Sequence, residues 1–355
     1  MRTPAMIAQW DDLARQCNDP NPFFESWYLL PAIDALAGAG QVELACLFAD
    51  GALAGLMPLA RSGSYYGKPV PHLAAWSHPN AFCGLPLVAK GHERPFWRAL
   101  FDALDRLPGL TAFLHLAELP GEGPMADALR EVLAEQLRPS AIVVEAERAM
   151  LASQLSPEDY FVASMSGKKR KELRRQANRL AEEGELAFTR HSDTAEIAEW
   201  IEQFLALERA GWKGAQGSAL GSADATAQLF RQALAGAAER GRLERLALTL
   251  DGRPIAMLAN FITPPGAYSF KTAFDENFAR YSPGVLLQRE NLTLLARSDI
   301  AWCDSCAAAD HPMIERIWRD KRRVTCTNIA IGGGLRRTLF RQLARIEARG
   351  QIREF

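Results

Sequence analysis

The sequence predicts a mixed α/β fold built as two domains. Its 355 residues are about twice the length of an average domain. Apolar strand-like segments are followed by amphipathic helical segments in both halves, a pattern typical of a central sheet covered by helices. An Asp-Gly turn joins two apolar strands in each half, at Asp50-Gly51 and Asp251-Gly252, which indicates a repeated hairpin. We place the domains at residues 1–150 and 151–355.

Turn and helix signals order the elements of the first domain. Asn21-Pro22 precedes an apolar helical segment, and Asp50-Gly51 favours a tight two-residue hairpin. Residues 64–91 are rich in Gly, Pro and aromatics, which predicts loops and short strands. The remaining expected elements are strands over 42–48, 53–59, 110–117 and 141–145, and helices over 92–107 and 124–137.

Capping signals mark helix ends in the second domain. Ser156 precedes Pro157 and two acids, which favour the positive end of a helix. A helix from Ser166 ends at Gly184. Its predicted apolar stripe is Leu173, Ala177 and Leu180. The other expected elements are helices over 194–212, 223–240, 312–318 and 335–348, a helix from Pro283, and strands over 243–250, 255–262, 267–273, 300–306 and 324–331.

The charges are unevenly distributed, although the chain has a formal net charge of −1. Residues 168–179 carry +6 and residues 315–353 carry +8, so the rest of the chain carries −15. Two basic patches therefore lie on an acidic body, both in the second domain. On a helix, Lys168, Lys171, Arg175 and Arg179 share one face. This face is either simply solvated or binds an anionic partner such as CoA phosphates, a nucleotide-sugar, an acidic glycan or tRNA.

The second basic patch and the lack of RNA-binding motifs limit the partner classes. Arg337, Arg341 and Arg345 share a face of the last helix, where they can be merely solubilising. No RNA-recognition motif or interleaved aromatic platform accompanies either patch, so we do not expect a nucleic-acid partner.

Composition also bears on location and metal binding. No apolar run reaches the roughly 18–20 residues of a membrane span. We expect no signal peptide, because Asp11 and Asp12 fall where its apolar core would lie. We therefore expect a cytoplasmic protein. The six cysteines are dispersed, and Cys303-x-x-Cys306 has no second pair, so we predict no metal site.

The loop between the strand over 267–273 and the next helix has the features of an anion site. Ser282 can cap the helix, Pro283 fits its first turn, and Gly284 lets a ligand approach the backbone. Arg280 adds a cation, and free helix amides suit a pyrophosphate. A purely structural helix start is the alternative. Neither a Walker loop nor a GxGxxG fingerprint is present.

Several stretches in the second half resemble the GNAT acyltransferase superfamily. More narrowly, they resemble the CelD-like acetyltransferases associated with cellulose and exopolysaccharide biosynthesis. The stretches are Ser166-Gly-Lys-Lys-Arg-Lys-Glu-Leu-Arg-Arg-Gln176, Phe204-Leu-Ala-Leu-Glu-Arg-Ala-Gly-Trp-Lys-Gly214, Phe270-Lys-Thr-Ala-Phe-Asp275, Tyr281-Ser-Pro-Gly-Val-Leu-Leu287, Asp304-Ser-Cys-Ala307, Asp310-His-Pro-Met-Ile314 and Trp318-Arg319.

The first half resembles the degenerate first domain of this group. Asn21-Pro-Phe-Phe-Glu-Ser-Trp27 and the hairpin after it carry this likeness. The layout is similar to the tandem Fem-type peptidyltransferases. The resemblance thus implies tandem GNAT-like domains, each a mixed central sheet flanked by helices. The superfamily's Gln/Arg-x-x-Gly-x-Gly/Ala loop is only partly matched by Arg280-Tyr-Ser-Pro-Gly-Val.

The resemblance implies acyl transfer from acetyl-CoA to an amine or hydroxyl of a glycan precursor or other small acceptor, without a metal. The donor thioester pairs with a sheet strand, and a backbone amide polarises its carbonyl. The residues assigned to the donor are Phe270, Thr272, Ala273, Arg280, Tyr281, Ser282, Pro283, Gly284 and Val285. Those assigned to the acceptor are Trp212, Lys213 and His311.

Three residues are candidates for the catalytic role, and the sequence leaves the choice open. Asp304 ends a strand and Glu208 lies on the helix before Trp212, so either carboxylate can serve as general base. Each can equally be an ordinary turn or helix acid. Lys271 lies among apolar strand residues, where it either faces a polar cleft or is solvated at an edge. His311 before Pro312 can instead be a capping residue.

Two other functions compete with acetyl transfer. An aminoacyl-tRNA-dependent peptidyltransferase of the Fem type would bind tRNA at the 168–179 helix and need no CoA. A non-catalytic GNAT-shaped module would bind a nucleotide or a partner enzyme, and the departure at the glycine loop favours it.

Overall fold

The computed structural model describes residues 1–348 and 353–355, which form two compact units. Unit 1 contains residues 1–29, 37–147 and 323–355, and unit 2 contains residues 30–36 and 148–322. The change from unit 1 to unit 2 after residue 147 lies close to the boundary predicted at residue 150. The prediction that the second domain runs on to residue 355 differs from this division, because the chain returns to unit 1 at residue 323.

The return to unit 1 has a structural cause in strand pairing and core packing. Strand β12 (Asp320–Ala330) pairs antiparallel with β5 (Phe113–Pro120). Helix α11 (Gly334–Glu347) buries Phe340 and Ala344 in an apolar cluster with Phe113. The C-terminal arginines predicted to lie on the cofactor-binding domain therefore belong to unit 1.

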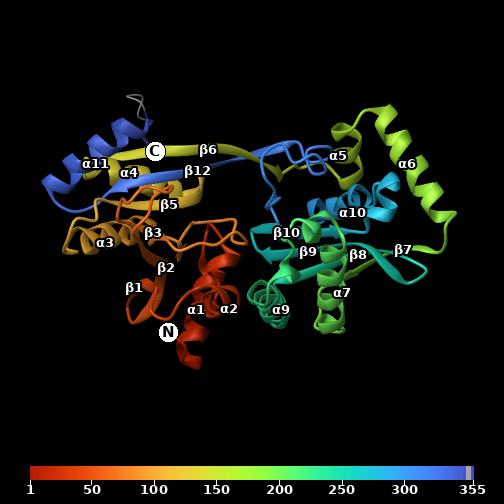
Figure 1. The fold of residues 1–355 in the computed structure, drawn as a ribbon, viewed down its shortest axis with the longest axis horizontal. Coiled ribbons are helices and arrows are strands. Elements are labelled where there is room, and N and C mark those ends of the chain that lie inside the picture. Colours follow the sequence, from red (N-terminus) through yellow and green to blue (C-terminus); the bar gives the residue numbers. More distant parts are fainter. Residues whose placement is uncertain (349–352) are drawn as a thin grey trace. The chain divides into compact units, whose positions relative to one another are not determined.

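Unit 1 is a mixed sheet with helices, coloured red to yellow and dark blue in Figure 1. Strands β6 and β12 each contribute residues to both units. The strand order is β1-β2-β3-β5-β12-β6, with β4 paired to β2. Its elements are α1 (Pro4–Gln16), η1 (Pro22–Phe24), α2 (Ser26–Leu36, whose end belongs to unit 2), β1 (Val42–Ala49), β2 (Ala52–Ser62), β3 (His72–Ala75), β4 (Leu87–Val88), α3 (Glu93–Asp105), β5, α4 (Pro124–Glu135), β6 (Ser140–Leu151), β12 and α11.

The predicted hairpins are present in both units. Asp50 and Gly51 have φ values of 51° and 79°, and Asp251 and Gly252 have 50° and 75°. Two successive positive φ values match the twist of antiparallel strands, which explains the Asp-Gly sequence. In unit 1 a methyl group on Gly55 would lie 2.4 Å from the Phe96 ring, so the small residue lets α3 pack closely on β2.

Asp105 at the end of α3 holds the C-terminal part of unit 1. Both of its oxygens accept hydrogen bonds of 2.9 Å from the buried guanidinium of Arg138. Arg138 also donates to the carbonyl of Ala330 in β12. The Gly332 amide donates to Asp105 at 2.6 Å, and Arg337 of α11 pairs with it at 3.1 Å. Helices α3 and α11 and strand β12 therefore meet at one carboxylate.

Unit 2 is a second mixed sheet with helices on both faces. The strand order is β6-β11-β10-β9-β8-β7. Its elements are α5 (Pro157–Ser164), α6 (Gly167–Ala181), β7 (Leu186–His191), α7 (Ile197–Ala210), α8 (Trp212–Ala215), η2 (Leu220–Ser222), α9 (Asp224–Glu239), β8 (Leu243–Leu250), β9 (Arg253–Thr263), β10 (Gly266–Phe274), η3 (Glu276–Tyr281), α10 (Pro283–Asn291), η4 (Leu292–Ala296) and β11 (Trp302–Asp304).

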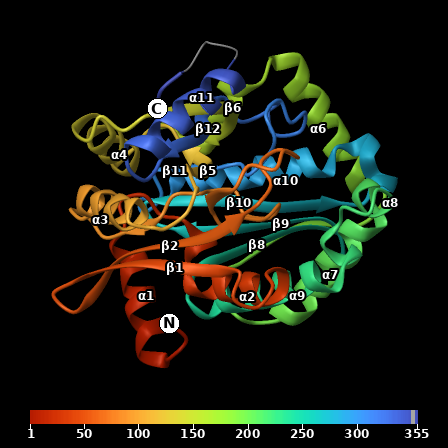
Figure 2. The same cartoon turned by 60° about the vertical axis from the view of Figure 1, so that its left-hand side comes forward.

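The two faces of the unit 2 sheet have different cores. Figures 1 and 2 show α7 and α9 on one face of β8, β9 and β10, and α10 on the other. On the α7–α9 face, stacked aromatic rings from four elements fill the core: Phe204, Phe230, Phe261 and Phe270. On the other face α6 buries Leu173 and Leu180, with Ala177 packed beside them, so the predicted stripe is confirmed.

The segment after β11 differs from the prediction. Residues 312–317 form turns where a helix over 312–318 was predicted, and the strand expected over 300–306 is limited to Trp302–Asp304. Ile314, Ile317 and Trp318 are buried together at the i, i+3, i+4 spacing that also suits a helical face, so this apolar pattern did not distinguish a helix from consecutive turns. Helix α1 and strand β7 were not predicted, whereas β3 lies in the segment 64–91 where short strands were expected. In the part of the chain that is described, no helix has the length and apolar character needed to cross a membrane.

Replacing Arg138 tests the Asp105 junction. We expect Arg138→Met to lower the free energy of unfolding by about 3 kcal/mol, because a buried partner of a carboxylate is removed. Burial raises the pKa of Asp105, but hydrogen bonds from Arg138 and Gly332 outweigh it and hold the pKa below its usual value. The stabilisation should therefore be present above about pH 4 and fall away as acid protonates the carboxyl.

Urea unfolding of the full chain at pH 7 and at lower pH measures this difference. Arg15→Met is the control, because the Arg15–Asp12 pair is exposed and should change stability by less than about 1 kcal/mol. The role of Asp105 would be contradicted if Arg138→Met and Arg15→Met lowered the free energy of unfolding equally. It would also be contradicted if the loss caused by Arg138→Met did not become smaller at low pH.

Candidate functional site

Two parallel strands separate in the middle of unit 2. Strand β11 pairs with β10 only at Gly266–Trp302, Ala267–Cys303 and Tyr268–Asp304. Strand β10 continues to Phe274 with β9 as its partner on the other side. Within the described residues, no strand pairs with β10 beyond Tyr268 on the β11 side. Backbone groups of the second half of β10 are therefore available to hydrogen-bond an extended ligand.

A β-bulge interrupts β10 at this point. Ser269 pairs with Asn260 of β9, while Lys271 pairs with the next residue, Ala259, so that Phe270 is an extra residue. Such a bulge changes the alternation of side chains along a strand. The Phe270 ring stacks on Phe261 and Phe230. The adjacent Lys271 lies on the same face, because its charge interacts with residues of α7 and α8.

A buried cluster of titratable groups lies beside the bulge. The Glu208 carboxylate accepts a 2.9 Å hydrogen bond from Lys213 and a 2.7 Å bond from the Leu220 amide. Burial and the positive charge of Lys213 together lower the pKa of Lys271 to about 8, against an opposing effect of Glu208. Glu208 is therefore occupied in holding Lys213, whereas Lys271 can exist as a neutral amine near neutral pH.

His311 joins this cluster from the loop after β11. Burial and the charge of Lys213 lower the pKa of the His311 imidazole, which is therefore neutral near pH 7. Its buried Nδ1 has no hydrogen-bond partner among the described residues. An unsatisfied buried nitrogen is costly, so this atom is positioned to bind a polar group that enters the site.

A small pocket connects the predicted acceptor residues with the predicted donor strand. Trp212 and Lys213 of α8 form one side, and Thr272 and Ala273 of β10 form the other. Glu276 also lines this pocket, and its carboxylate accepts a 2.6 Å hydrogen bond from the Trp212 amide. Glu276 had not been predicted, since nothing in its local sequence distinguishes it from other loop acids.

Asp304 lies apart from this pocket in a buried ion triad. Its Oδ1 is 3.0 Å from Nε of Arg148, and its Oδ2 is 3.2 Å from Arg322, whose guanidinium covers the Trp302 ring. The Cys306 amide donates to the same carboxylate at 2.8 Å. With both oxygens engaged and the side chain buried, Asp304 is arranged to fix the end of β11. The two arginines lie 156 and 18 residues away in sequence, so no local pattern reveals them.

The start of α10 corrects two details of the predicted anion site. Ser282 has a left-handed backbone (φ 55°, ψ 50°) and makes no side-chain cap; its carbonyl, not its hydroxyl, accepts from Val285 and Leu286. A methyl group on Gly284 would lie 2.6 Å from the sulfur of Met313. Gly284 therefore makes room for Met313 of this chain, and the approach to the backbone that was assigned to a ligand is filled.

Arg280 and Tyr281 connect this loop to the end of α6. Both donate to the Glu183 carboxylate, Arg280 at 3.1 Å, and the Arg280 guanidinium covers the Tyr281 ring. Pro283 and Val285 are buried in the first turn of α10. This part of the predicted donor set is thus engaged in packing α6 and α10, while Arg280 remains exposed to solvent.

The structure thus divides the predicted residues into groups. One group meets at the pocket and the titratable cluster: Glu208, Trp212, Lys213, Lys271, Thr272, Ala273 and His311. Asp304, the α10 start and Phe270 lie in the packing around it. Among the described residues, no group of three His, Cys, Asp or Glu side chains could hold a metal ion. Burial raises the pKa of Cys306 well above its usual value, which keeps it a thiol.

Comparisons with known proteins bear on both the domain and the fold. Residues 167–322 match the family model described as an acetyltransferase (GNAT) domain. No curated protein sequence is significantly similar to the chain. A crystal structure of FemX has a TM-score of 0.60 at 10% identity and covers 97% of this chain and 99% of its own. A conserved protein of unknown function from Bacteroides thetaiotaomicron VPI-5482 has a TM-score of 0.57 at 12% identity, covering 92% and 97%.

At these identities the two structures establish similarity of fold, namely a mixed α/β architecture with a large mixed sheet flanked by helices. The matched segment contains the separated strands, the bulge and the titratable cluster. Residues 167–322 of the chain are therefore similar to a GNAT acetyltransferase domain.

Proposed function

We propose that unit 2 transfers an acyl group, most simply acetyl, from an acyl-CoA thioester to an amine or hydroxyl acceptor. The observation that supports this most strongly is the bulged and unpaired half of β10 next to Lys271, inside the segment that matches a GNAT domain. A polysaccharide precursor is the acceptor class that the resemblance to CelD-like enzymes favours.

In this proposal the free edge of β10 binds the amide-bearing arm of the donor. Backbone groups beyond Tyr268 hydrogen-bond it as a neighbouring strand would, and one amide polarises the thioester carbonyl. The acceptor enters beside Trp212 and Lys213, so that its nucleophilic atom meets the carbonyl at Thr272 and Ala273. Holding both reactants on one strand supplies proximity, which accounts for a large part of the rate enhancement in bimolecular transfers.

Lys271 is the residue that we assign as proton acceptor. A pKa of about 8 makes a substantial fraction of the side chain a neutral amine near neutral pH, which can take a proton from an ammonium or hydroxyl acceptor. His311, neutral and with an unsatisfied Nδ1, orients the acceptor by a hydrogen bond. Glu208 positions Lys213, and Asp304 positions the end of β11; neither needs to change its protonation state.

The phosphates of the donor need a cationic surface, for which α6 and the loop before α10 are the candidates. Arg170 donates to two backbone carbonyls and Arg175 pairs with Glu172, so these two are engaged. Lys168 and Lys171 are exposed on the same helix. We assign these two lysines to the anionic part of the donor, which keeps the anionic-partner hypothesis for the 168–179 helix. Arg280 of the predicted donor set pairs with Glu183 instead.

Thermal stability in the presence of acetyl-CoA tests the proposed donor. A ligand bound at one hundred times its Kd stabilises the native state by about 2.7 kcal/mol, so we expect saturating acetyl-CoA to raise the Tm of the full chain. CoA should act similarly, and pantetheine, which lacks the nucleotide phosphates, should bind more weakly. Absence of any shift at millimolar acetyl-CoA would contradict the proposal, and salt-dependent binding of tRNA instead would support a Fem-type function.

The pH dependence of acyl transfer tests Lys271. With an acceptor found in a panel of amines and sugars, CoA release should rise about tenfold per pH unit below pH 8 and level off above it, because the neutral amine is the active form. Lys271→Arg keeps the charge but cannot lose its proton, so its rate should fall at least about 100-fold. Lys169→Arg, on exposed α6, is the matched control. A rate that instead decreases above pH 8 would mean that the ammonium form acts.

Substitution of Asp304 distinguishes a positioning role from a general base. Asp304→Asn leaves Arg148 and Arg322 without their carboxylate, so we expect a loss of about 3–5 kcal/mol in the free energy of unfolding. Urea unfolding measures it. Unchanged stability together with abolished transfer would show that Asp304 acts in the chemistry and would overturn the positioning role.

A further inference from the structure

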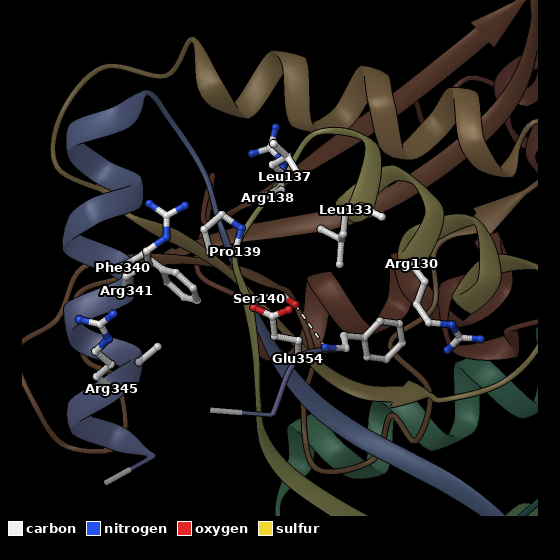
Figure 3. A pocket seen from close by; sticks show the side chains of 13 residues that line it. Arg130, Leu133, Leu137, Arg138, Pro139, Ser140, Phe340, Arg341, Arg345 and Glu354 are labelled. Carbon is white, nitrogen blue, oxygen red and sulfur yellow. Dashed lines mark hydrogen bonds between the residues drawn. The ribbon is translucent and has the colours of Figure 1, made fainter. Parts of the chain in front are cut away.

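A cavity in unit 1, lined by none of the residues discussed for acyl transfer, has its own pattern of charge. It has a volume of about 490 Å³, within the range of small-molecule sites. Its walls come from α4 and the loop after it, the start of β6, α11, and the residues Glu354 and Phe355. Figure 3 shows Arg341 and Arg345 of α11 at one side of it and Arg130 at the other.

The arginines around this cavity differ in whether other residues of the chain already bind their guanidinium groups. Arg138 is held by Asp105, and Arg130 donates to the Gly121 carbonyl and pairs with Asp127. By contrast, Arg341 and Arg345 are exposed and have no hydrogen bond or ion pair to any described residue. Four residues apart on one helix, they present two forked guanidinium groups on one face.

One acid and one hydroxyl complete the polar lining. Glu354 lies between the arginines in Figure 3, and the Ser140 hydroxyl accepts a 3.2 Å hydrogen bond from the Phe355 amide. Even with Glu354 ionised, the four arginines leave an excess of positive charge on the lining. A dianion such as a phosphate group would pair with the guanidinium groups of Arg341 and Arg345. The planar guanidinium group can donate two parallel hydrogen bonds to phosphate oxygens.

Apolar side chains form the rest of the lining, and one of them is held in a strained conformation. Leu133, Phe340 and Phe355 contribute apolar surface. Leu137 is 83% exposed and has φ 43°, a left-handed conformation that is rare for a bulky residue. An exposed leucine held this way at the rim supplies an apolar contact for a ligand at the cost of local strain.

We infer that this cavity binds an organic phosphate, with the phosphate at Arg341 and Arg345 and an apolar or ring-bearing group against Leu137, Phe340 and Phe355. The site belongs to unit 1 and does not depend on the function proposed for unit 2. In this proposal Arg341 and Arg345 bind a ligand, rather than only making the surface of α11 soluble.

Phenyl phosphate is the probe, and thermal shift and calorimetry of the full chain are the measurements. We expect it to bind more tightly than inorganic phosphate, which lacks the ring, and than benzyl alcohol, which lacks the charge. Arg341→Gln with Arg345→Gln should weaken its binding at least about tenfold. Arg61→Gln with Lys90→Gln removes the same charge from exposed positions of unit 1 and should leave the affinity unchanged.

A second variant tests the apolar contact separately. Asn accepts the left-handed backbone of position 137, so Leu137→Asn should fold normally while weakening phenyl phosphate and not inorganic phosphate. Three results would each overturn the inference: no saturable binding by the wild type at millimolar probe, equal binding by the Arg341/Arg345 variant, or equal affinity for inorganic phosphate and phenyl phosphate. The Tm of each unliganded variant shows that it is folded.

Discussion

The bulge at Phe270 is the constraint on which the site in unit 2 depends. A regular strand would place Phe270 and Lys271 on opposite faces of the sheet. The extra residue places both on the α7–α9 face, so the ring completes the aromatic core while the amine reaches Lys213 and Glu208. The low pKa of Lys271 follows from this position, since a lysine beside a packed core loses hydration.

Buried charge fixes the strand that ends next to this bulge. Asp304 terminates β11 between Arg148 and Arg322, and the three groups satisfy one another within unit 2. Because breaking such a cluster would leave unpaired buried charges, the end of β11 cannot easily move toward β10. The separation of the two parallel strands is thus maintained by electrostatics on one side and by the bulge on the other. Asp105 has a comparable role in unit 1, where it joins α3, β12 and α11.

Much of the fold could be predicted from local sequence signals, and the functional roles of single acids could not. Asp-Gly turns determine both hairpins, and Ser156 caps α5 as predicted, with its hydroxyl accepting from the Asp159 amide. Asp304 and Glu208 were equal candidates in the sequence because any acid near a strand or helix end can titrate. What distinguishes Lys271 from them is contact between distant segments: each carboxylate is occupied by partners, whereas burial lowers the pKa of the amine.

The C-terminal arginines show why a helical face by itself does not define a role. Arg337, Arg341 and Arg345 share a face of α11 in the sequence pattern, and solubility was a sufficient explanation for all three. In the folded chain Arg337 pairs with Asp105 and donates to the Gln136 and Gly332 carbonyls, so it holds the helix in place. The next two turns extend past that junction over the cavity, where Arg341 and Arg345 make no ion pair with a described residue. The position of each arginine relative to the half-buried Asp105 carboxylate therefore distinguishes the structural Arg337 from Arg341 and Arg345, which are free to bind an anion.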